Sequence, residues 1–448
     1  MKTTAIIAGL SAFSFVPALL ADVTVDITGA TAFRAAALTA IRSKYNASGA
    51  AYQFSHDQAA GAYTGATRSI FKGTFQGIAG VTTIRTSFNG SVEGIRALVD
   101  SPASDPTYYT EILGNFVTAA AIGGGETNKD TVGFAKTTAA SQSEIAFSDV
   151  SKAATPYSGF SLQPGSSTCG VVVFTMLANE GSPVTNVTSQ QFRALMSNGF
   201  LPRSVFSGVE ADNPIGDAPG VNAGYVFSTG RNDGSGTRTT YLAETGYGIA
   251  NAVKQYVTNV STSTALTTIQ LVPAGGVNDP ALPGQLAGNA STVWSNDIAG
   301  NGGYSSGSTL RTDMGKTGAA VTVLDETGAD AFGEPVIADL VTWLSLNDAT
   351  TARANGAVVC SYNGVKLNDF ATSGTMSAAD RAKVTEGAYT AWGFQQLYRR
   401  NDITAGDAVT VYTGIKTALE NSANLASAGI TIPEMNVGRP FDGGTVAP

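Results

Sequence analysis

The chain has 448 residues, of which 43% are hydrophobic and 13% are charged, and its net charge at pH 7 is −8. This length is enough for two packed lobes, and the hydrophobic share excludes an intrinsically disordered chain. The negative net charge argues against nucleic acid as a general partner. A site for an anion therefore has to be built locally, from backbone N–H groups and a few arginines.

The first 21 residues have the pattern of a secretory signal peptide. Lys2 supplies the positive start, residues 5–20 form an apolar run with a break at Pro17, and small residues lie near Ala21. The run is too short and too weakly flanked for a membrane-spanning helix, and no second long apolar stretch follows. We expect a periplasmic or secreted protein that does not itself span a membrane.

From residue 22 onward the chain repeats one unit, a strand followed by a tight turn and a helix. In the first unit Val23, Val25 and Ile27 alternate along a strand, and Leu38 and Ile41 share one face of a helix. Repeated units of this kind predict an α/β protein with mainly parallel sheets. The expected strand–helix pairs are 22–28 with 35–45, 81–88 with 92–99, and 225–229 with 235–244.

Other segments between and after these units have distinct patterns. Residues 144–149 and 170–176 read as strands, the second buried on both faces because it is almost unbrokenly apolar. Residues 188–198 read as a helix that opens with a capping box formed by Thr188 and Gln191. Residues 380–400 are expected to be helix-rich with aromatic side chains. The Gly-, Asn- and Ser-rich stretch 273–316 is expected to be a loop or insertion that forms a lip over the site.

The segment 231–238, Arg-Asn-Asp-Gly-Ser-Gly-Thr-Arg, lies between an expected strand and an expected helix. We call residues 231–237 the arginine loop. Free N–H groups at a helix start carry partial positive charge, glycines allow a ligand to approach the backbone, and Arg231 offers a planar fork to two oxygens. Taken alone, the loop fits an anion site and an ordinary helix start with solvated arginines equally well.

Further segments place polar groups at the carboxyl ends of expected strands, the edge where open α/β sheets bind ligands. Thr31 lies in the turn 28–33, Ser91 follows Asn89-Gly90, and Asp149 ends the strand 145–147. Each residue alone fits a cap or a turn former better than a ligand. Together with the arginine loop they form one set.

These segments, and their order along the chain, resemble the phosphate-binding subunit of bacterial ABC phosphate importers, the PstS-like family. Residues 27–33 are similar to its ITGAGATF-type start, residues 85–95 to its YxxxGSGxGI-type segment, and residues 146–149 to its GxSD-type strand end. The arginine loop matches its RxDGSGT loop almost letter for letter, and residues 387–398 resemble its late G-x-Y-x-x-W-G-Y-x-x-L-Y run. The resemblance implies a two-lobed type II periplasmic-binding-protein fold with a two-segment hinge.

The resemblance also implies a ligand set around a dehydrated phosphate. Arg231 would pair with phosphate oxygens, and Asp149 would accept the proton of the monohydrogen form, which favours phosphate or arsenate over sulfate. The first loop reads TGATAF where the family has TGAGATF, so the residue that supplies its hydroxyl stays open. The implied phosphate-binding residues are Thr31, Ala32, Phe33, Ser91, Asp149, Arg231, Ser235, Gly236 and Thr237.

The expected function is that of an extracytoplasmic solute-binding protein that captures inorganic phosphate between two lobes for an ABC permease. We expect a monomer without enzyme chemistry, cofactor or metal. Domain I would comprise residues 22–168 and 368–448, and domain II residues 169–367, with the insertion at about 273–316. The alternatives are a secreted surface or matrix protein that reuses the fold, a binder of molybdate, tungstate or sulfate, and a hydrolase.

Some polar residues are not expected to take part in the site. His56 is the single histidine and no G-x-S-x-G elbow accompanies it, so we expect a surface residue and no catalytic triad. One histidine and two distant cysteines do not suit a transition-metal cluster. Cys169 and Cys360 fit a disulfide and two buried thiols equally well. Arg34 stands where the family often has proline, and we expect a solvated helix residue rather than an extra ligand.

Overall fold

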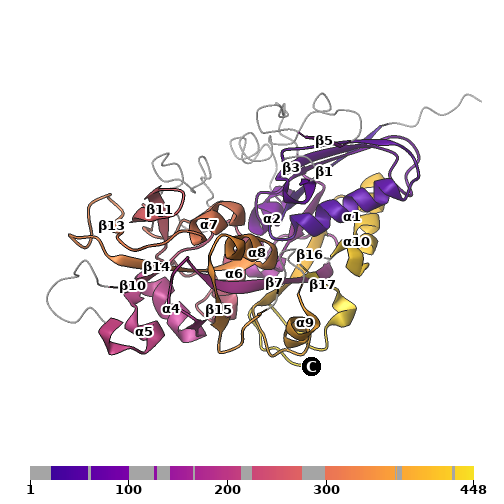
Figure 1. Ribbon diagram of the computed structural model, residues 1–448. Coiled ribbons are helices and arrows are strands. Elements are labelled where there is room, and N and C mark those ends of the chain that lie inside the picture. The colour runs from indigo at the N-terminus through magenta and orange to yellow at the C-terminus, as the bar shows by residue number, and fades with distance from the viewer. Residues whose placement is uncertain are drawn as a thin grey trace, which may run out of the picture.

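The computed structural model describes residues 22–58, 62–99, 126–128, 142–164, 167–212, 224–274, 298–368, 370, 376–425 and 429–448. The predicted signal peptide, residues 1–21, lies outside the described residues. Within them, one large mixed sheet runs through the molecule, and helices pack on each of its two halves (Figure 1). No helix of the described part combines the length and apolarity that crossing a bilayer requires.

The first half-sheet has the strand order β5-β2-β3-β4-β1-β6. Its central strand β1 runs parallel to β4 and to β6, so the carboxyl ends of all three strands meet at one edge. Strand β3 pairs antiparallel with β4, and β2 pairs antiparallel with β3. The bounds are β1 Val23–Gly29, β2 Tyr52–His56, β3 Arg68–Gly73, β4 Thr82–Ser87, β5 Glu126–Asn128 and β6 Ile145–Ser148.

Two helices follow directly from strands of this half, as the sequence pattern predicts. Helix α1 (Arg34–Asn46) follows β1 and buries Leu38 and Ile41, and α2 (Ser91–Val99) follows β4. Helix α10 (Asp407–Leu419), from the end of the chain, packs on α1. The first two strand–turn–helix predictions are therefore confirmed.

The second half-sheet has the order β14-β10-β9 (Ile337–Ser345, Gly224–Ser228 and Phe200–Pro202), with β10 parallel to β14. Helix α6 (Gly236–Glu244) follows β10 and begins at the residue after its N-cap, Ser235. The third predicted unit is confirmed. Helix α4 (Ser189–Asn198) opens with the predicted capping box of Thr188 and Gln191.

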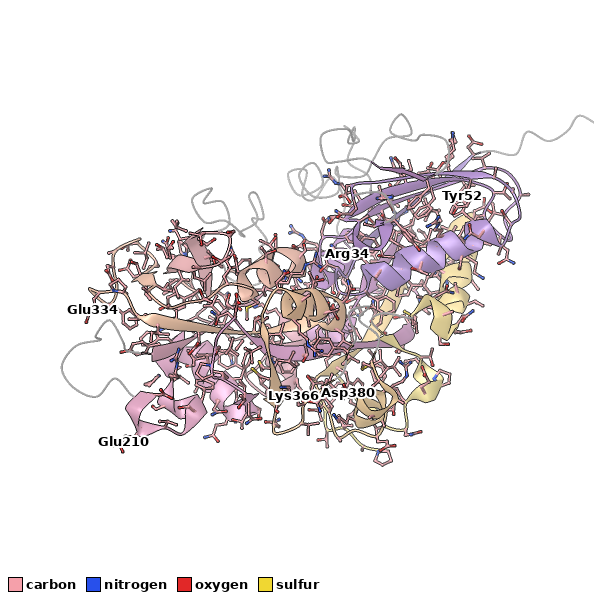
Figure 2. The ribbon with its side chains drawn as sticks, in the orientation of Figure 1. Arg34, Tyr52, Glu210, Glu334, Lys366 and Asp380 are labelled. Carbon is pink, nitrogen blue, oxygen red and sulfur yellow. The ribbon has the colours of Figure 1, made fainter. Side chains whose placement is uncertain are left out.

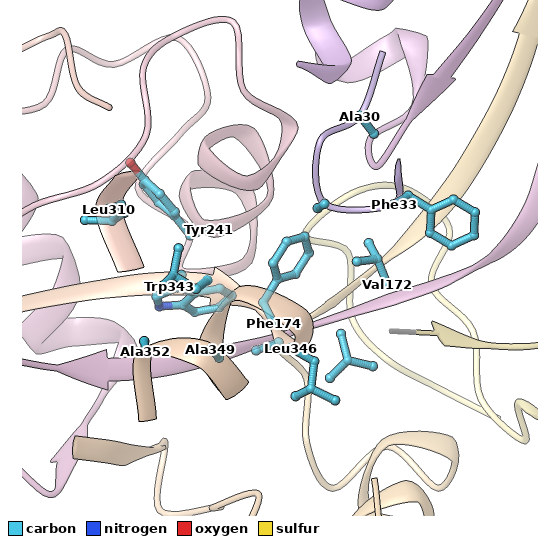
Figure 3. Close-up of a cluster of buried hydrophobic side chains, with 14 of the residues drawn as sticks. Ala30, Phe33, Val172, Phe174, Tyr241, Leu310, Trp343, Leu346, Ala349 and Ala352 are labelled. Carbon is cyan, nitrogen blue, oxygen red and sulfur yellow. The ribbon is translucent and has the colours of Figure 1, made fainter. Parts of the chain in front are cut away.

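The two halves are joined by the long strand β7 (Thr168–Ala178). Its first part pairs with β16 (Trp392–Arg399), and the part from Phe174 onward pairs with β14 and β15 (Val358–Tyr362). The chain passes from the first half to the second through β7 and returns to the first half just before β16. The Phe174 N–H donates to the Ala391 carbonyl at 2.9 Å, so the two connecting segments lie side by side. Buried side chains of both halves form one cluster along this strand, including Phe33, Val172, Phe174, Tyr241 and Trp343 (Figure 3).

The prediction of helical structure over 380–400 is wrong in its second half. Helix α9 (Ala378–Thr385) ends early, and β16 then runs between β6 and β7, antiparallel to both. Trp392 is fully buried there, because a central strand has a packed face on each side. Aromatic side chains in this stretch therefore reflect strand packing rather than a helix face.

The stretch 273–316 is also more ordered than a loop in its described part. Helix α7 (Gly307–Met314) closes it, while residues 275–297 lie outside the described residues. The remaining elements are β8 Asn186–Val187, α5 Ser204–Ser207, β11 Tyr256–Ser261, β12 Leu266–Leu271, β13 Thr322–Leu324, α8 Leu346–Ala354 and β17 Gly429–Ile430.

Candidate functional site

The turns that follow β1, β4 and β10 are in backbone contact. The Gly90 N–H donates to the Gly29 carbonyl at 2.9 Å, which joins the turns after β4 and β1. The Val92 N–H donates to the Gly234 carbonyl at 3.2 Å, which joins the first half of the molecule to the arginine loop of the second half. Segments that the sequence singled out separately therefore meet at one place between the two halves.

This close approach depends on glycine. Gly90 has φ 126°, and a Cβ built there would lie 2.5 Å from the Gly234 carbonyl oxygen. A Cβ at Gly94 would lie 2.6 Å from the Gly29 Cα. Any side chain at either position would push apart the turns that form the site.

Arg231 is a fixed, buried cation at this place. Its side chain donates from Nε to the Tyr304 carbonyl at 3.1 Å, from Nη2 to the Ser305 carbonyl at 2.7 Å, and from Nη1 to Thr31 Oγ1 at 3.3 Å. Arg231 is only 2% exposed. Burial lowers its pKa to about 10, so the guanidinium remains charged at neutral pH. The reading of the arginine loop as a helix start with solvated arginines is excluded.

Asp149 lies at the carboxyl end of β6, facing Ser91 at the start of α2. Ser91 Oγ donates to Asp149 Oδ1, and the Asp149 N–H donates to Ser91 Oγ at 3.2 Å. Asp149 is 1% exposed, and burial raises its pKa to about 7 although the charge of Arg231 lowers it. The carboxyl group can therefore change its protonation state near neutral pH.

The start of α6 supplies backbone donors next to this carboxyl group. Ser235 caps the helix by accepting a hydrogen bond from the Arg238 N–H at 3.5 Å. The N–H groups of Gly236 and Thr237 lie in the first turn, where a helix has no internal acceptors and its dipole is positive. A Cβ at Gly236 would collide with Asp149 Oδ1 and Ser91 Oγ, so the helix start directly abuts that pair.

The first turn of α1 also has backbone N–H groups without acceptors inside the helix. Phe33 is the N-cap residue, and its ring is buried 6.1 Å from that of Phe147. Ala32 is buried beside it, and the Thr31 hydroxyl accepts from Arg231. The structure thus places Thr31, of the TGATAF segment, against the arginine loop.

Other residues at the site were missed by the sequence prediction. Tyr304 and Ser305, which hold Arg231, belong to the stretch expected only to form a lip, and the pattern of glycines around them gave no signal for this role. Arg34 was expected to be solvated, and this is wrong because it is 4% exposed. Its position directly after the TGATAF turn is the feature of the sequence that could have indicated a buried arginine near the site.

The expectation of a surface His56 is also wrong. His56 is fully buried in β2, where its ring lies 5.2 Å from that of Phe54 and its Nδ1 accepts from the Gln58 N–H at 3.3 Å. Cys169 and Cys360 are both buried free thiols, which excludes the disulfide alternative. In the described part of the chain no three His, Cys, Asp or Glu side chains form a group that could hold a metal ion.

No protein-family model matches the sequence, and no curated protein matches it. A solved structure from Clostridium perfringens, assigned as a phosphate ABC transporter substrate-binding protein and containing bound phosphate, aligns with 10% identity and a TM-score of 0.43 over 91% of this chain and 99% of its own. An ABC-type phosphate transport receptor from Vibrio cholerae aligns with 10% identity and a TM-score of 0.38 over the same shares. PstS from Borrelia burgdorferi aligns with 10% identity and a TM-score of 0.33 over 88% and 92%.

Proposed function

We propose that this chain is an extracytoplasmic solute-binding protein that captures inorganic phosphate between two lobes and delivers it to an ABC permease. One observation carries the proposal: the turns after β1, β4, β6 and β10 converge on a buried point where Arg231, Ser91, Asp149 and the start of α6 meet. A guanidinium and helix N-termini suit the oxygens of a tetrahedral anion. A single carboxyl group among them suits an anion that carries a proton.

The proposed ligands divide by the bonds they offer. Arg231 supplies charge and a planar fork, and Ser91 a hydroxyl. The turns before α1 and α6 supply backbone N–H groups together with the hydroxyls of Thr31, Ser235 and Thr237. Asp149 accepts the proton of the monohydrogen anion, and an acceptor left without a donor by sulfate would be unfavourable by about 1–3 kcal/mol. The full set is Thr31, Ala32, Phe33, Ser91, Asp149, Arg231, Ser235, Gly236 and Thr237.

In this proposal the first lobe comprises residues 22–168 and 368–448, and the second lobe comprises residues 169–367. The two lobes move about a hinge formed by the two segments that connect them, one in β7 and one near Ala391. Capture is closure of the lobes over the anion. The signal-peptide pattern of residues 1–21 supports an extracytoplasmic location. A monomer that presents the loaded form to a permease needs no catalytic step.

The proposal is tested by titrating the purified protein with phosphate, sulfate, molybdate and tungstate while measuring Tm and binding heat. We expect phosphate to raise Tm selectively, because a ligand that binds the folded state stabilises it. Arg231→Ala should abolish this shift. Arg203→Ala is the control, because Arg203 follows the outer strand β9 and is paired with Asp339 of β14 at 2.6 Å. Its loss should affect Tm but not phosphate binding.

Each other result contradicts the proposal in a distinct way. The absence of a shift with any oxyanion would favour the surface or matrix protein. A larger shift with molybdate, tungstate or sulfate would assign another anion. Phosphate binding that survives Arg231→Ala would place the site elsewhere.

A further inference from the structure

Arg34 is a buried guanidinium with too few partners. It is the first residue of α1 and lies at the end of that helix nearest the second half of the molecule (Figure 2). Its hydrogen bonding within the described residues consists of one contact, from Nη1 to Thr67 Oγ1 at 3.5 Å, and its Nε is buried without a partner. A guanidinium has five N–H donors, and buried polar groups are nearly always satisfied.

Among the described residues, no carboxylate forms an ion pair with Arg34. Asp348, at the start of α8, is the acidic residue whose charge acts most strongly on both Arg34 and Arg231. That carboxylate is already paired with Arg311 Nη1 at 2.9 Å and accepts from Ser345 at 3.3 Å. The charge of Asp348 is therefore already matched by Arg311, and it does not balance Arg34 and Arg231 as well.

The other nearby acids do not correct this imbalance. Asp57 accepts from the backbone N–H groups of Thr67 and Arg68 at 3.0 and 3.1 Å, and the Arg68 side chain lies 3.6 Å from it. Asp149 is partly protonated at neutral pH, because burial raises its pKa to about 7. The immediate surroundings of Arg34 and Arg231 consequently hold an excess of buried positive charge, which is unfavourable unless an anion offsets it.

We infer that Arg34 is a further binding residue, a second guanidinium of the anion site that supplies the charge needed to balance the doubly ionised form of phosphate. The inference rests on the proposed function and deepens it. Arg231 and Arg34 influence each other electrostatically, and Thr31, which accepts from Arg231, lies three residues before Arg34 in the turn that leads into α1. One anion between the halves is therefore placed to offset both cations.

Two variants of Arg34 test this inference. Arg34→Met removes the charge and keeps an apolar stem, and Arg34→Lys keeps the charge. The control is Arg42→Met in the same helix, whose Nε donates to Tyr52 Oη at 3.0 Å and whose guanidinium lies 4.6 Å from the centre of the Tyr63 ring. The Kd for inorganic phosphate is measured at about pH 5.5 and about pH 8, together with the Tm of the ligand-free protein.

We expect Arg34→Met to weaken phosphate binding at least about tenfold at the higher pH, where phosphate is a dianion, and clearly less at the lower pH. The native protein contains the same Asp149, Asp57, Asp348, Arg231 and Arg311. The contribution of these groups to the pH dependence of Kd therefore cancels when variant and native protein are compared at each pH. Arg34→Lys should retain most of the affinity, and Arg42→Met all of it. The ligand-free Tm of Arg34→Met should be unchanged or higher, because an unbalanced buried cation has been removed.

Unchanged phosphate affinity in Arg34→Met would overturn the inference. A drop in ligand-free Tm with equal loss of affinity at both pH values would also overturn it, because that result describes a structural residue. If the native protein binds no phosphate at all, the proposed function fails instead. The two failures are distinguishable because the first requires a native protein that binds.

Discussion

Ser91 and Asp149, 58 residues apart in the sequence, share a hydrogen bond from the serine hydroxyl to carboxylate Oδ1. The pair joins the carboxyl end of β6 to the start of α2, and the start of α6 packs directly against it. The carboxyl group is therefore held in one orientation, between a hydroxyl of the first half and backbone N–H groups of the second. In the proposed function, this fixed position and the charge of the carboxyl group together select the anion.

Asp149→Asn should reduce discrimination against sulfate. Asparagine keeps the shape of the side chain but carries no charge and can donate to an anion that has no proton. We expect the ratio of sulfate to phosphate Kd to fall about ten- to a hundredfold, measured by isothermal titration of each anion. Asp402→Asn, at an exposed ion pair with Arg400, should leave the ratio unchanged. Undiminished exclusion of sulfate in Asp149→Asn would refute proton recognition by this residue.

The ligand-free protein should lose stability as the pH rises from about 4 to about 7. Burial raises the pKa of Asp149, Asp233 and Glu144 to about 7 in the folded state, while their ordinary values are 3.8, 3.8 and 4.5. The folded state thus binds more protons than the unfolded state within this window, so the free energy of unfolding falls as the pH increases. Glu434, whose pKa is lowered from 4.5 to about 2 by the hydrogen bond from Arg381, acts in the opposite sense, and its effect is complete near the lower end of this window.

Urea unfolding at about pH 5 and about pH 8 measures this slope. Asp149→Asn and Asp233→Asn, combined, should flatten it, because neither amide titrates. Stability of the native protein that is level or increases across the window would contradict the assignment of raised pKa values to these carboxyl groups.

Gly236→Ala should abolish phosphate binding and destabilise the protein. The new Cβ would collide with Asp149 Oδ1 and Ser91 Oγ, so the start of α6 would have to move away from the first half. Overpacking of this kind typically destabilises a protein by about 1–3 kcal/mol. Gly159→Ala is the matched control, because its Cβ would have no neighbour within 4 Å. The check is Tm with and without phosphate, and a normal phosphate shift in Gly236→Ala would show that this contact is not needed.

Arg439→Met should destabilise the fold by about 3 kcal/mol. Arg439 pairs with Glu244 at 2.8 Å, donates to the Thr390 carbonyl at 2.8 Å and lies 4.1 Å from the centre of the Trp392 ring. Removing it leaves Glu244 buried without its cation, and breaking a buried pair is far more damaging than breaking an exposed one.

The matched control is Arg381→Met, which breaks the partly exposed pair with Glu434 and should lower the free energy of unfolding by less than about 1 kcal/mol. Urea unfolding of both variants gives the comparison. Equal losses in the two variants would show that the Arg439 pair contributes no more than a surface contact.

Local sequence patterns predicted much of the fold and several parts of the candidate site. The capping box of Thr188 and Gln191 depends on residues three positions apart, and a local pattern records it fully. The N-cap of α6 at Ser235 and the strand–turn–helix units are local in the same way. Their convergence followed from a general rule, because carboxyl ends of parallel strands share an edge.

What the sequence did not predict depends on contacts between distant segments. The strand β16 carries aromatic residues that suit a helix face equally well, and only its pairing with β6 and β7 decides the structure. Arg34 reads as a solvated helix residue, and its burial results from packing of the first half against the second. The carbonyls of Tyr304 and Ser305 hold Arg231 through backbone atoms, which no side-chain pattern encodes.

The shared strand β7 makes the two halves interdependent in unfolding. If the first half unfolded, Val171–Val173 would lose their pairing with β16, and if the second half unfolded, Phe174–Ala178 would lose their pairing with β14. In either case the half that stays folded would contain backbone N–H and carbonyl groups without hydrogen-bond partners. We therefore expect that neither half folds on its own. Heating should accordingly disrupt both in one cooperative transition, and cleavage of the backbone within this strand should inactivate the whole molecule rather than release a working lobe.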